Sequence, residues 1–551
     1  MNTLKQRLAS VPPVVWVLAL TLACLVPFIN KAFHIDDTLF IRAGEHIQKQ
    51  PVHFYTFIMN WFGIPQPFPL DFENPPLACY YIALAASVAG WSEPALHAAF
   101  LLPALAAAWG VFSLARLYSQ RPLVAALATV LTPVFLISAT SVMCDVMLMA
   151  FWVWSLALFE RGLQSNQWRW FLGSGLLAGL AVLTKFTGLA LIPLLAAYGF
   201  TRRPKPGRWL AAVTGPVLFA AAYEWATSRL YGHGLLFAAT AYSSQGRVDL
   251  GTHLLEQTVI GLAFAGGSFL SLLLYVPWLW PRRAVLLAVC VLVPPAFLLP
   301  SLTHLHPVLV REGHLNWFAF IQCFLLIAGG LHILVLVGND FWRHRDSVSF
   351  LLVTWILGIF VFAIALNWTV NGRSFLPAAP ALGILLARRL ELRANSAAPR
   401  PAPRARALWP ALAGGVLSLC LVRADYHFAR LNRVAAAQIC AQYLKPGNSL
   451  WFEGHWGFQY YMEKYGAKPM DVSVSKLPSG DILVLPSNST NVQEPPKDAY
   501  ESIDTFECLP SRYCTLMNTF SGAGFYASST APLPFIAGRI PPDHFWILRA
   551  K

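Results

Sequence analysis

The sequence has few charged residues. Only 12% of its 551 residues are Asp, Glu, Lys or Arg, whereas 56% are hydrophobic, and the chain contains 20 Trp and 37 Phe. A soluble globular protein has about 25% charged and about 45–50% apolar residues, so this composition excludes an ordinary soluble enzyme. It predicts a protein that crosses a membrane several times.

Acidic residues are the scarcer kind of charge. The chain has 26 Asp and Glu against 40 Lys and Arg, a formal net charge of +14. A balance this basic can indicate nucleic-acid binding, but in a chain with repeated apolar runs Lys and Arg more often mark the cytoplasmic ends of membrane spans. We therefore expect membrane lipids around the protein and no nucleic-acid partner.

Two further features are missing. We find no signal-peptide cleavage pattern after the first apolar run, so this run is expected to remain as a span. We also find no clear internal repeat between the two halves. Many transporters are built from related halves. A polytopic lipid or sugar transporter or flippase without transferase chemistry is therefore kept as the alternative to an enzyme.

Apolar runs that can cross a bilayer of about 30 Å, which takes roughly 17 to 25 residues, recur along the chain. They begin near Val11, Pro94, Leu123, Asp145, Leu210, Glu256, Ala284, Trp317, Val348, Ser374 and Leu408. Residues 171–183 and 187–200 predict two short helices broken at "TKFTG". The segment "PPLACYYIALAASVAGW" has an apolar part of about 14 residues, which fits an interfacial or re-entrant helix better than a span.

Leaving that segment out gives thirteen spans and a cytoplasmic N-terminus. The basic clusters "RLYSQR", "RRPKPGR", "PRR", "FWRHR" and "RRLELRANSAAPRPAPRAR" then all lie inside, as the positive-inside rule requires. If the segment crossed the membrane, all of them would lie outside. This topology places a first loop of about residues 30–93 outside, together with the start of the span at Asp145 and everything after about Val422.

The last part of the chain has a different character. "GDILVLP" and "MDVSVSKLP" predict short strands and "AAAQICAQYL" predicts a helix, so residues 423–551 are expected to form a small extracytoplasmic α/β domain after a transmembrane domain of residues 1–422. Of nine cysteines, Cys508 and Cys514 in "ECLPSRYC" are the expected disulfide, because this compartment is oxidising.

Two adjacent carboxylates, Asp36 and Asp37, stand at the start of the first outer loop. Apolar residues recur around them at helical spacing, namely Ile35, Leu39, Ala43 and Ile47. The pattern predicts that the acids open an amphipathic helix lying in the membrane interface. One interpretation is a solvated helix start, since acidic residues in a first turn interact favourably with the helix dipole.

A third acid and two cations are predicted on the same outer side. Asp145 begins a span, where an unpaired carboxylate is costly and indicates a functional site unless it snorkels to the interface. Lys185 lies between the two short helices, and Arg373 precedes the "FLPAAPALGILLARR" run. Carboxylates and cations at one membrane face suit an active site that handles a hydroxyl and a phosphate. Anchoring to lipid headgroups is the other interpretation of each cation.

These features follow one another over about residues 11–393: the acidic pair, "FENPPLACYYIAL", "GWSEPALHAAFLLPALAAAWGVFSLARLYSQR", Asp145, "GLLAGLAVLTKFTGLALIPLL" and "GRSFLPAAPALGILLA". The series resembles the bacterial branch of the GT-C glycosyltransferases, which are related to protein O-mannosyltransferases and to the lipid A aminoarabinose transferase. The resemblance implies a GT-C-like fold of about thirteen transmembrane helices in the bacterial cytoplasmic membrane. It also implies transfer of a hexosyl or pentosyl group from a polyprenyl-phosphate carrier to a lipid, glycan or protein acceptor on the outer face.

The resemblance also implies roles for individual residues. Asp36 and Asp37 match the first-loop acidic motif, whose carboxylate acts as the base or orients the acceptor, and Asp145 matches the second acidic position. The candidates for binding the donor phosphate are Lys185, Arg311 and Arg373. The candidates for substrate binding lie in the "FENPPLACYY" stretch and are Glu73, Asn74, Tyr80 and Tyr81.

Asn74 departs from the aminoarabinose branch, which has a lysine here that approaches the carrier phosphate. A neutral amide can form a hydrogen bond with phosphate but cannot neutralise its charge. The position therefore speaks against aminoarabinose as the sugar and assigns phosphate neutralisation to other cations.

Three histidines in "THLHPVLVREGH" raise the question of a metal. His304, His306 and His314 stand in one outer loop, with a spacing that can bind zinc. Polar loop histidines that bind no metal are more common. We expect no required cofactor, with a divalent metal as the minor alternative, and assign Arg311 in the same loop to phosphate binding.

Overall fold

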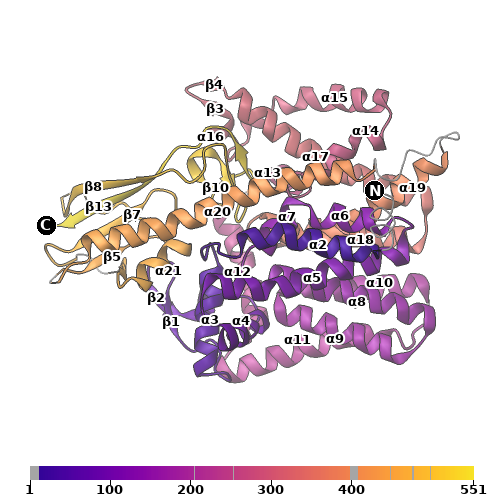
Figure 1. Cartoon of the computed structure of the whole chain (residues 1–551), viewed down its shortest axis with the longest axis horizontal. Helices are drawn as coiled ribbons and strands as arrows, with labels where there is room; N and C mark the ends of the chain where they lie inside the picture. Colours follow the sequence, from indigo (N-terminus) through magenta and orange to yellow (C-terminus); the bar gives the residue numbers. More distant parts are fainter. Residues whose placement is uncertain are drawn as a thin grey trace. The chain divides into compact units, whose positions relative to one another are not determined.

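The computed structural model describes residues 11–203, 205–251, 253–396, 407–446, 448–473, 477–496 and 498–551 (Figure 1). The chain forms two compact units. The first comprises Met1–Pro27, Phe100–Thr140 and Cys144–Cys420, and the second comprises Phe28–Ala99, Ser141–Met143 and Leu421–Lys551. The first outer loop predicted from the sequence thus belongs to the same unit as the C-terminal segment.

The first unit consists almost entirely of helices, and two of its helices, α5 and α20, continue into the second unit. They are α2 (Pro13–Leu25), α5 (Glu93–Tyr118), α6 (Pro122–Val130), α7 (Pro133–Ala139), α8 (Asp145–Ser165), α9 (Trp168–Thr184), α10 (Leu191–Arg202), α11 (Leu210–Tyr231), α12 (Leu235–Leu250), α13 (Leu254–Ser268), α14 (Val276–Leu279), α15 (Arg282–Ala296), α16 (His306–Leu309), α17 (Trp317–His344), α18 (Ser347–Val361), α19 (Ala379–Ser396) and α20 (Trp409–Tyr443).

Within the described residues, five helices are long and apolar enough to cross a membrane: α5, α8, α17 and the segments 282–301 and 347–366. Two bent pairs, α6 with α7 at 62° and α13 with residues 270–279 at 74°, raise the number to seven if each pair is one span. The structure therefore confirms a helical protein with many apolar helices, whereas the count of thirteen spans stays a prediction.

The bend between α6 and α7 has a local cause. Pro133 is the first residue of α7 and lacks the backbone N–H that would continue the helix from α6. Thr132 caps α7, because its side chain accepts a hydrogen bond from the backbone N–H of Phe135. The segment that was doubtful as a span forms α4 (Leu77–Ala89), which at 1.5 Å per residue is about 20 Å long and too short to cross a bilayer.

Small residues let α13 and α17 pack closely. A Cβ atom on Gly266 would lie 1.8 Å from the carbonyl oxygen of Leu326, and one on Gly330 would lie 2.2 Å from the carbonyl oxygen of Leu262. Any larger residue would force these two backbones apart. Such close backbone approach is typical of helix pairs in membranes.

The second unit combines helices and strands. Its first-loop part contains α3 (Asp37–Lys49), the hairpin β1 (Ile58–Asn60) with β2 (Pro65–Pro67), and α4. Its C-terminal part contains a five-stranded sheet in the order β6-β5-β7-β13-β8, in which β5 is parallel to β6 and β7, and β13 is antiparallel to β7 and β8 (Figure 1). The strands are β5 (Leu450–Phe452), β6 (Lys468–Pro469), β7 (Ile482–Pro486), β8 (Tyr500–Cys508) and β13 (Asp543–Ala550), with α21 (Trp456–Lys464) between β5 and β6.

The expected small sheet region at the C-terminus is therefore present, with three corrections. "GDILVLP" forms β7, but β6 ends at Pro469, and residues 470–473 of "MDVSVSKLP" form no strand; residues 474–476 lie outside the described residues. The predicted helix "AAAQICAQYL" is the last part of α20, which begins at Trp409 and is continuous over 35 residues. The predicted helix and the apolar run before it therefore form one continuous helix without a linker between them.

The third correction concerns the expected disulfide. No disulfide joins Cys508 to Cys514, and both lie in the described part of the chain. Cys508 ends β8 in the five-stranded sheet, whereas Cys514 begins β9 (Cys514–Thr515), which pairs with β12 (Ile536–Ala537) in a separate small sheet. The short spacing in the sequence therefore does not bring the two cysteines together as partners.

Candidate active site

Asp145 lies in the first unit together with two of the predicted cations. The Lys185 ammonium donates a hydrogen bond of 2.7 Å to Asp145 Oδ1, and Arg373 Nη1 lies 3.8 Å from Asp145 Oδ2. The Asp145 side chain is buried, whereas Lys185 keeps 20% of its side-chain surface exposed and Arg373 keeps 11%. Lys and Arg are the side chains that bind phosphate oxygens, so the cluster suits an anionic ligand.

Both cations lie where helices are interrupted. Lys185 has an extended backbone, with φ −158° and ψ 140°, between α9 and the short helix η3 (Phe186–Ala190). The turn folds back tightly at Gly188, where a Cβ atom would lie 2.5 Å from the carbonyl carbon of Ala181. The break at "TKFTG" predicted from the sequence is thus present, and it directs Lys185 to Asp145.

Arg373 is held by a second interruption, the short helix η7 (Gly372–Ala378). Asn371 caps this helix, since its side-chain oxygen accepts a 2.8 Å hydrogen bond from the backbone N–H of Ser374. A cap of this kind fixes the first turn of a helix. It therefore fixes the backbone from which Arg373 reaches Asp145.

Asp37 lies in the interior of the second unit. Its side chain is fully buried, with Oδ2 accepting a 2.9 Å hydrogen bond from the backbone N–H of His34 and Oδ1 accepting one of 2.7 Å from Val142. Burial raises the pKa of Asp37 to about 7, against the opposing effect of the Lys31 charge and the two N–H donors. The predicted helix start is present at Asp37. The prediction of a solvated carboxylate is wrong for Asp37, because its side chain is buried. Its two oxygens accept hydrogen bonds from two separate backbone segments and so hold these segments together.

Asp36 is the more accessible acid of the pair. It is the N-cap residue of α3, its side chain makes no capping hydrogen bond, and it is partly exposed. Its negative charge adds to the rise in the pKa of Glu73 and opposes the fall in the pKa of His455. Asp36 therefore lies within electrostatic range of a first-loop acid and a histidine from the C-terminal part of the same unit.

Glu73 is a second strongly perturbed acid of the first loop. Burial raises its pKa to about 8, and the charges of Asp36 and Asp71 raise it further. Burial also raises the pKa of Asp71 to about 6, although the Gln66 side chain donates a hydrogen bond to it. At neutral pH Glu73 is therefore protonated and can donate a hydrogen bond near Asp36.

The raised pKa of Glu73 predicts a dependence of stability on pH. Between its ordinary value of 4.5 and about 8, the folded protein holds one more proton at this site than the unfolded chain does. Stability therefore falls as the pH rises through this window. In the Glu73→Gln variant, the decrease in melting temperature across the window is expected to be smaller than in the wild type. Parallel curves for the two proteins would contradict the raised pKa, and Glu494→Gln on an exposed loop is the control.

The other candidates for substrate binding in the first loop, Asn74, Tyr80 and Tyr81, form hydrogen bonds that hold the backbone in place. The Tyr80 hydroxyl donates a hydrogen bond to the carbonyl oxygen of Pro51, and the Tyr81 hydroxyl donates one of 2.6 Å to that of Ala99. The backbone carbonyl of Asn74 accepts a 2.8 Å hydrogen bond from the Tyr55 hydroxyl. These contacts give both tyrosines a structural role in holding α4.

The loop histidines and Arg311 make separate contacts and do not gather around one point. His304 Nδ1 is 3.2 Å from Glu256, the His306 ring bonds the carbonyl oxygen of Pro300, and Arg311 pairs with His314 across the hairpin of β3 (Val310–Arg311) and β4 (His314–Leu315). Among the described residues no group of three or more His, Cys, Asp or Glu is arranged to hold a metal ion. Arg311 is exposed on this hairpin.

Sequence reasoning missed a buried network next to the acidic pair. Lys31 Nζ lies 2.5 Å from Asp425 Oδ2, with 0% and 1% of the two side chains exposed. The Tyr526 hydroxyl donates a 2.8 Å hydrogen bond to Asp425, and His34 Nε2 lies 3.3 Å from its other oxygen. Burial raises the pKa of Asp425, but Lys31 and His34 lower it by more, so that it falls well below its usual range.

The family model for dolichyl-phosphate-mannose-protein mannosyltransferase matches residues 73–225 of the chain. Over that part of the chain the match confirms the resemblance to the GT-C glycosyltransferases. The matched range includes Glu73, Asp145 and Lys185. A comparison with curated proteins gave no match.

Among solved structures, the chain is similar to ArnT from Cupriavidus metallidurans bound to undecaprenyl phosphate, with 16% identity and a TM-score of 0.49 over 86% of this chain and 93% of that one. It is also similar to the apo oligosaccharyltransferase of Archaeoglobus fulgidus (13% identity, TM-score 0.44, 83% and 64% covered). The arabinosyltransferase EmbB from Mycobacterium smegmatis gives 16% identity and a TM-score of 0.33, with 88% and 45% covered. These values are too low to carry information about the substrate.

Proposed function

We propose that the protein is a glycosyltransferase that moves a hexosyl or pentosyl group from a polyprenyl-phosphate carrier to a lipid, glycan or protein acceptor. The reaction takes place on the outer face of the bacterial cytoplasmic membrane. The observation that carries the proposal is the cluster of Asp145, Lys185 and Arg373, in which two cations contact one buried carboxylate. The family-model match over residues 73–225 supports the same class of reaction.

In the proposed reaction Lys185 and Arg373 bind the phosphate of the carrier. Arg can hold two phosphate oxygens in a fork, and Lys acts as a point charge. Asp145 orients both cations through its two oxygens. As the bond between the sugar and the phosphate breaks, the electron pair stays on the phosphate oxygen, and the two cations stabilise the charge that develops there.

Asp36 is the proposed general base. It accepts the proton of the acceptor hydroxyl while the hydroxyl oxygen forms a new bond to the anomeric carbon. Its partial exposure fits this role, whereas both oxygens of Asp37 accept backbone hydrogen bonds. Asp37 is therefore proposed to fix the start of α3, on which Asp36 stands.

Binding of the carrier tests the donor site. Lys185→Met and Arg373→Gln are each expected to weaken the binding of undecaprenyl phosphate to the purified protein by about tenfold or more, because each removes a charged hydrogen-bond donor. Arg283→Gln, an exposed cation at the start of α15, is the matched control and is expected to bind normally. Normal binding by both cluster variants would refute the donor site. A flippase, the alternative function, would also bind and move the lipid but would transfer no sugar to an acceptor.

The proposed topology has thirteen spans, with the first loop and the C-terminal part of the second unit outside. Cysteines introduced at two exposed positions test it, Pro65 in the first loop and Gln120 between α5 and α6. In a background without other reactive cysteines, Pro65→Cys is expected to react with an impermeant thiol reagent added from outside, and Gln120→Cys is not. Labelling of both from the same side would rule out the thirteen-span arrangement.

A further inference from the structure

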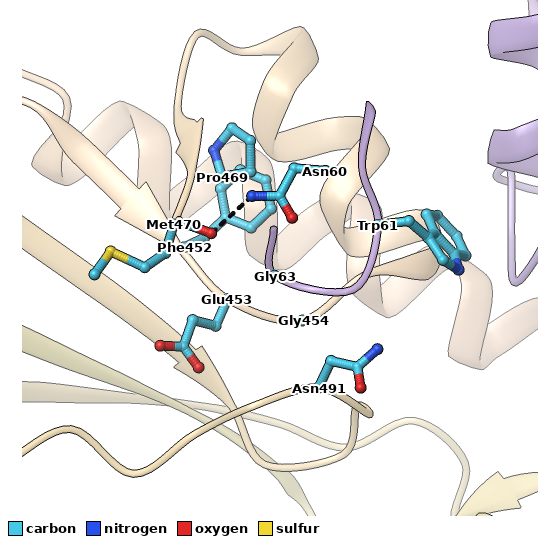
Figure 2. A pocket seen from close by; sticks show the side chains of 9 residues that line it. All are labelled: Asn60, Trp61, Gly63, Phe452, Glu453, Gly454, Pro469, Met470 and Asn491. Carbon is cyan, nitrogen blue, oxygen red and sulfur yellow. Dashed lines mark hydrogen bonds between the residues drawn. The ribbon is translucent and has the colours of Figure 1, made fainter. Parts of the chain in front are cut away.

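The hollow between the first-loop hairpin and the five-stranded sheet of the second unit is too small to enclose an organic ligand (Figure 2). Its enclosed part has room for about one water molecule. The Asn60 side chain, which lines it, donates a 2.8 Å hydrogen bond to the carbonyl oxygen of Met470, drawn as a dashed line in Figure 2. The first unit offers a different feature, a buried arginine that has no ion pair within the described part of the chain.

Arg389 is this buried arginine. It lies on α19, it is only 7% exposed, and its guanidinium carbon lies 5.2 Å from the centre of the Trp280 ring. Its side chain makes no hydrogen bond and no ion pair with the described residues, and its Nε atom is buried without a partner among them. Burying a charge is costly unless the charge is paired. The site therefore favours an anion.

Two hydrogen bonds hold the chain around Trp280 in place. The indole N–H of Trp280 donates a 2.9 Å hydrogen bond to Nε2 of His332 on α17, which fixes the ring under the Arg389 guanidinium. Two residues earlier, the carbonyl oxygen of Trp278 accepts a 2.7 Å hydrogen bond from Arg393 Nη1. Arg389 and Arg393 are four residues apart on α19, so they lie on the same face of the helix. Both arginines therefore face one short segment of the chain.

Two acids at this end of the first unit contact a different arginine. Asp346 Oδ2 lies 3.1 Å from Arg388 Nη2, and Asp340 Oδ1 lies 3.6 Å from Arg388 Nε. Arg388 therefore takes the negative charge that these acids supply, and Arg389 contacts neither of them.

A further cation, Arg343, adds to the positive charge around Arg389. It stands on α17 three residues after Asp340, so the two share the face of α17 that contacts α19, and its charge acts on Arg389. Arg343 is exposed and makes no ion pair with the described residues. Residues 397–406, which lie outside the described residues, include three more arginines and no acid. The sequence of this segment therefore supplies no anionic partner.

Arg343, Arg389 and Arg393 form, together with Trp280, an arginine cluster that is separate from the proposed donor site. Arg389 lies ten residues after Ala379, the first residue of α19, which is about 15 Å along the helix. Arg373 of the donor site lies before that start, in η7. In the proposed topology the end of α19 that carries the arginine cluster faces the cytoplasm.

Apolar surface that lipid chains can cover lies next to the arginine cluster. Trp278 is 43% exposed, and the apolar segment 282–301, which begins two residues after Trp280, is only 6% buried within the protein. Trp rings at the ends of spans typically lie at the level of the lipid headgroups. A ligand with an anionic head and apolar chains fits both surfaces.

We propose that the arginine cluster binds the phosphate of an anionic phospholipid in the cytoplasmic leaflet. Arg389 holds phosphate oxygens in a fork, and Arg343 and Arg393 add positive charge. The acyl chains lie along the segment 282–301. Basic pockets between helices at the cytoplasmic face commonly bind anionic headgroups. The inference is independent of the transferase chemistry and rests on the proposed topology for the choice of leaflet.

Lipid binding to the full-length protein, followed by native mass spectrometry from detergent, tests the arginine cluster. Phosphatidylglycerol is the anionic probe, and phosphatidylcholine with the same acyl chains is the zwitterionic one. The wild type is expected to bind one phosphatidylglycerol about tenfold more tightly than phosphatidylcholine, and Arg389→Gln is expected to lose this preference. Arg343→Gln removes an exposed charge and leaves the packing of the helices intact, and it is expected to weaken phosphatidylglycerol binding about fivefold.

Arg161→Gln is the matched control. Arg161 also lies over a tryptophan, 5.6 Å from the centre of the Trp170 ring, but it is exposed. This variant and Lys185→Met at the donor site are both expected to bind phosphatidylglycerol as the wild type does. A wild type without the preference, an unchanged preference in both cluster variants, or an equal loss in Arg161→Gln would overturn the proposal.

Two further outcomes would identify another ligand or another site. Loss of the preference in Lys185→Met, with Arg389→Gln unchanged, would place the lipid at the donor site and overturn the proposal. Displacement of phosphatidylglycerol by an excess of inorganic phosphate, but not by chloride at the same ionic strength, would identify a soluble phosphate as the ligand and overturn the assignment to a lipid.

Discussion

Asp36→Asn is expected to lower the rate of sugar transfer by about a hundredfold to ten-thousandfold, the usual contribution of a general base. Asn is nearly isosteric with Asp but cannot take up the acceptor proton. Asp36 makes no capping hydrogen bond with α3, so its replacement removes no helix cap. Turnover by the purified variant, measured after its melting temperature is shown to be close to that of the wild type, checks this result.

Asp37→Asn is the informative comparison. Both oxygens of Asp37 accept hydrogen bonds from backbone N–H groups. The Asn side chain would place its NH2 group, which is a donor, against one of these two N–H donors, so the variant is expected to lose about 1–3 kcal/mol of stability. Asp498→Asn, at an exposed position of the same unit, is the control for the substitution itself. If Asp36→Asn retains near-normal turnover, the catalytic assignment of Asp36 is wrong.

Breaking the buried Lys31–Asp425 pair is expected to have the largest effect on stability. Lys31→Met leaves the Asp425 carboxylate without its cation in a site that is 1% exposed, and Asp425→Asn leaves the Lys31 ammonium without its anion. An unpaired buried charge typically costs about 3–5 kcal/mol. Each variant is therefore expected to melt well below the wild type when unfolding in detergent is followed by tryptophan fluorescence.

The chain offers a matched control for burial. The Arg42–Glu463 pair has the same 2.5 Å separation, but its side chains are 27% and 22% exposed. An ion pair that remains in contact with solvent usually contributes about 0–1 kcal/mol, so Arg42→Gln is expected to lower the melting temperature only slightly. Equal effects for Lys31→Met and Arg42→Gln would show that burial does not set the strength of the Lys31–Asp425 interaction.

Local patterns in the sequence predicted the parts of the candidate site that depend on neighbouring residues. The helical spacing after Asp36 predicted α3, and the interruption at "TKFTG" predicted the break that carries Lys185. Charge placement at the ends of apolar runs predicted Asp145 and two cations, Lys185 and Arg373, on the same membrane face as the acidic pair, and in the structure these three residues are in contact.

The division of roles within the acidic pair could not be predicted in this way. It depends on a hydrogen bond from Val142, which lies 105 residues after Asp37. The Lys31–Asp425 pair joins residues 394 positions apart. The hydroxyls of Tyr80 and Tyr81 likewise bind carbonyl groups that no local pattern indicates. Such long-range contacts are set by tertiary packing, and a single sequence without known partners does not reveal them.

The raised pKa values of the first-loop acids change the charge that this loop presents to a ligand. With pKa values of about 7 for Asp37 and about 8 for Glu73, a formal count of carboxylates overstates the negative charge near Asp36 at neutral pH. An anionic ligand that approaches this loop, such as the lipid carrier proposed above, is therefore expected to meet less repulsion than the formal charges imply, which favours rapid association. As the pH rises above about 8, ionisation of Glu73 is expected to restore that repulsion and to slow the approach of such a ligand.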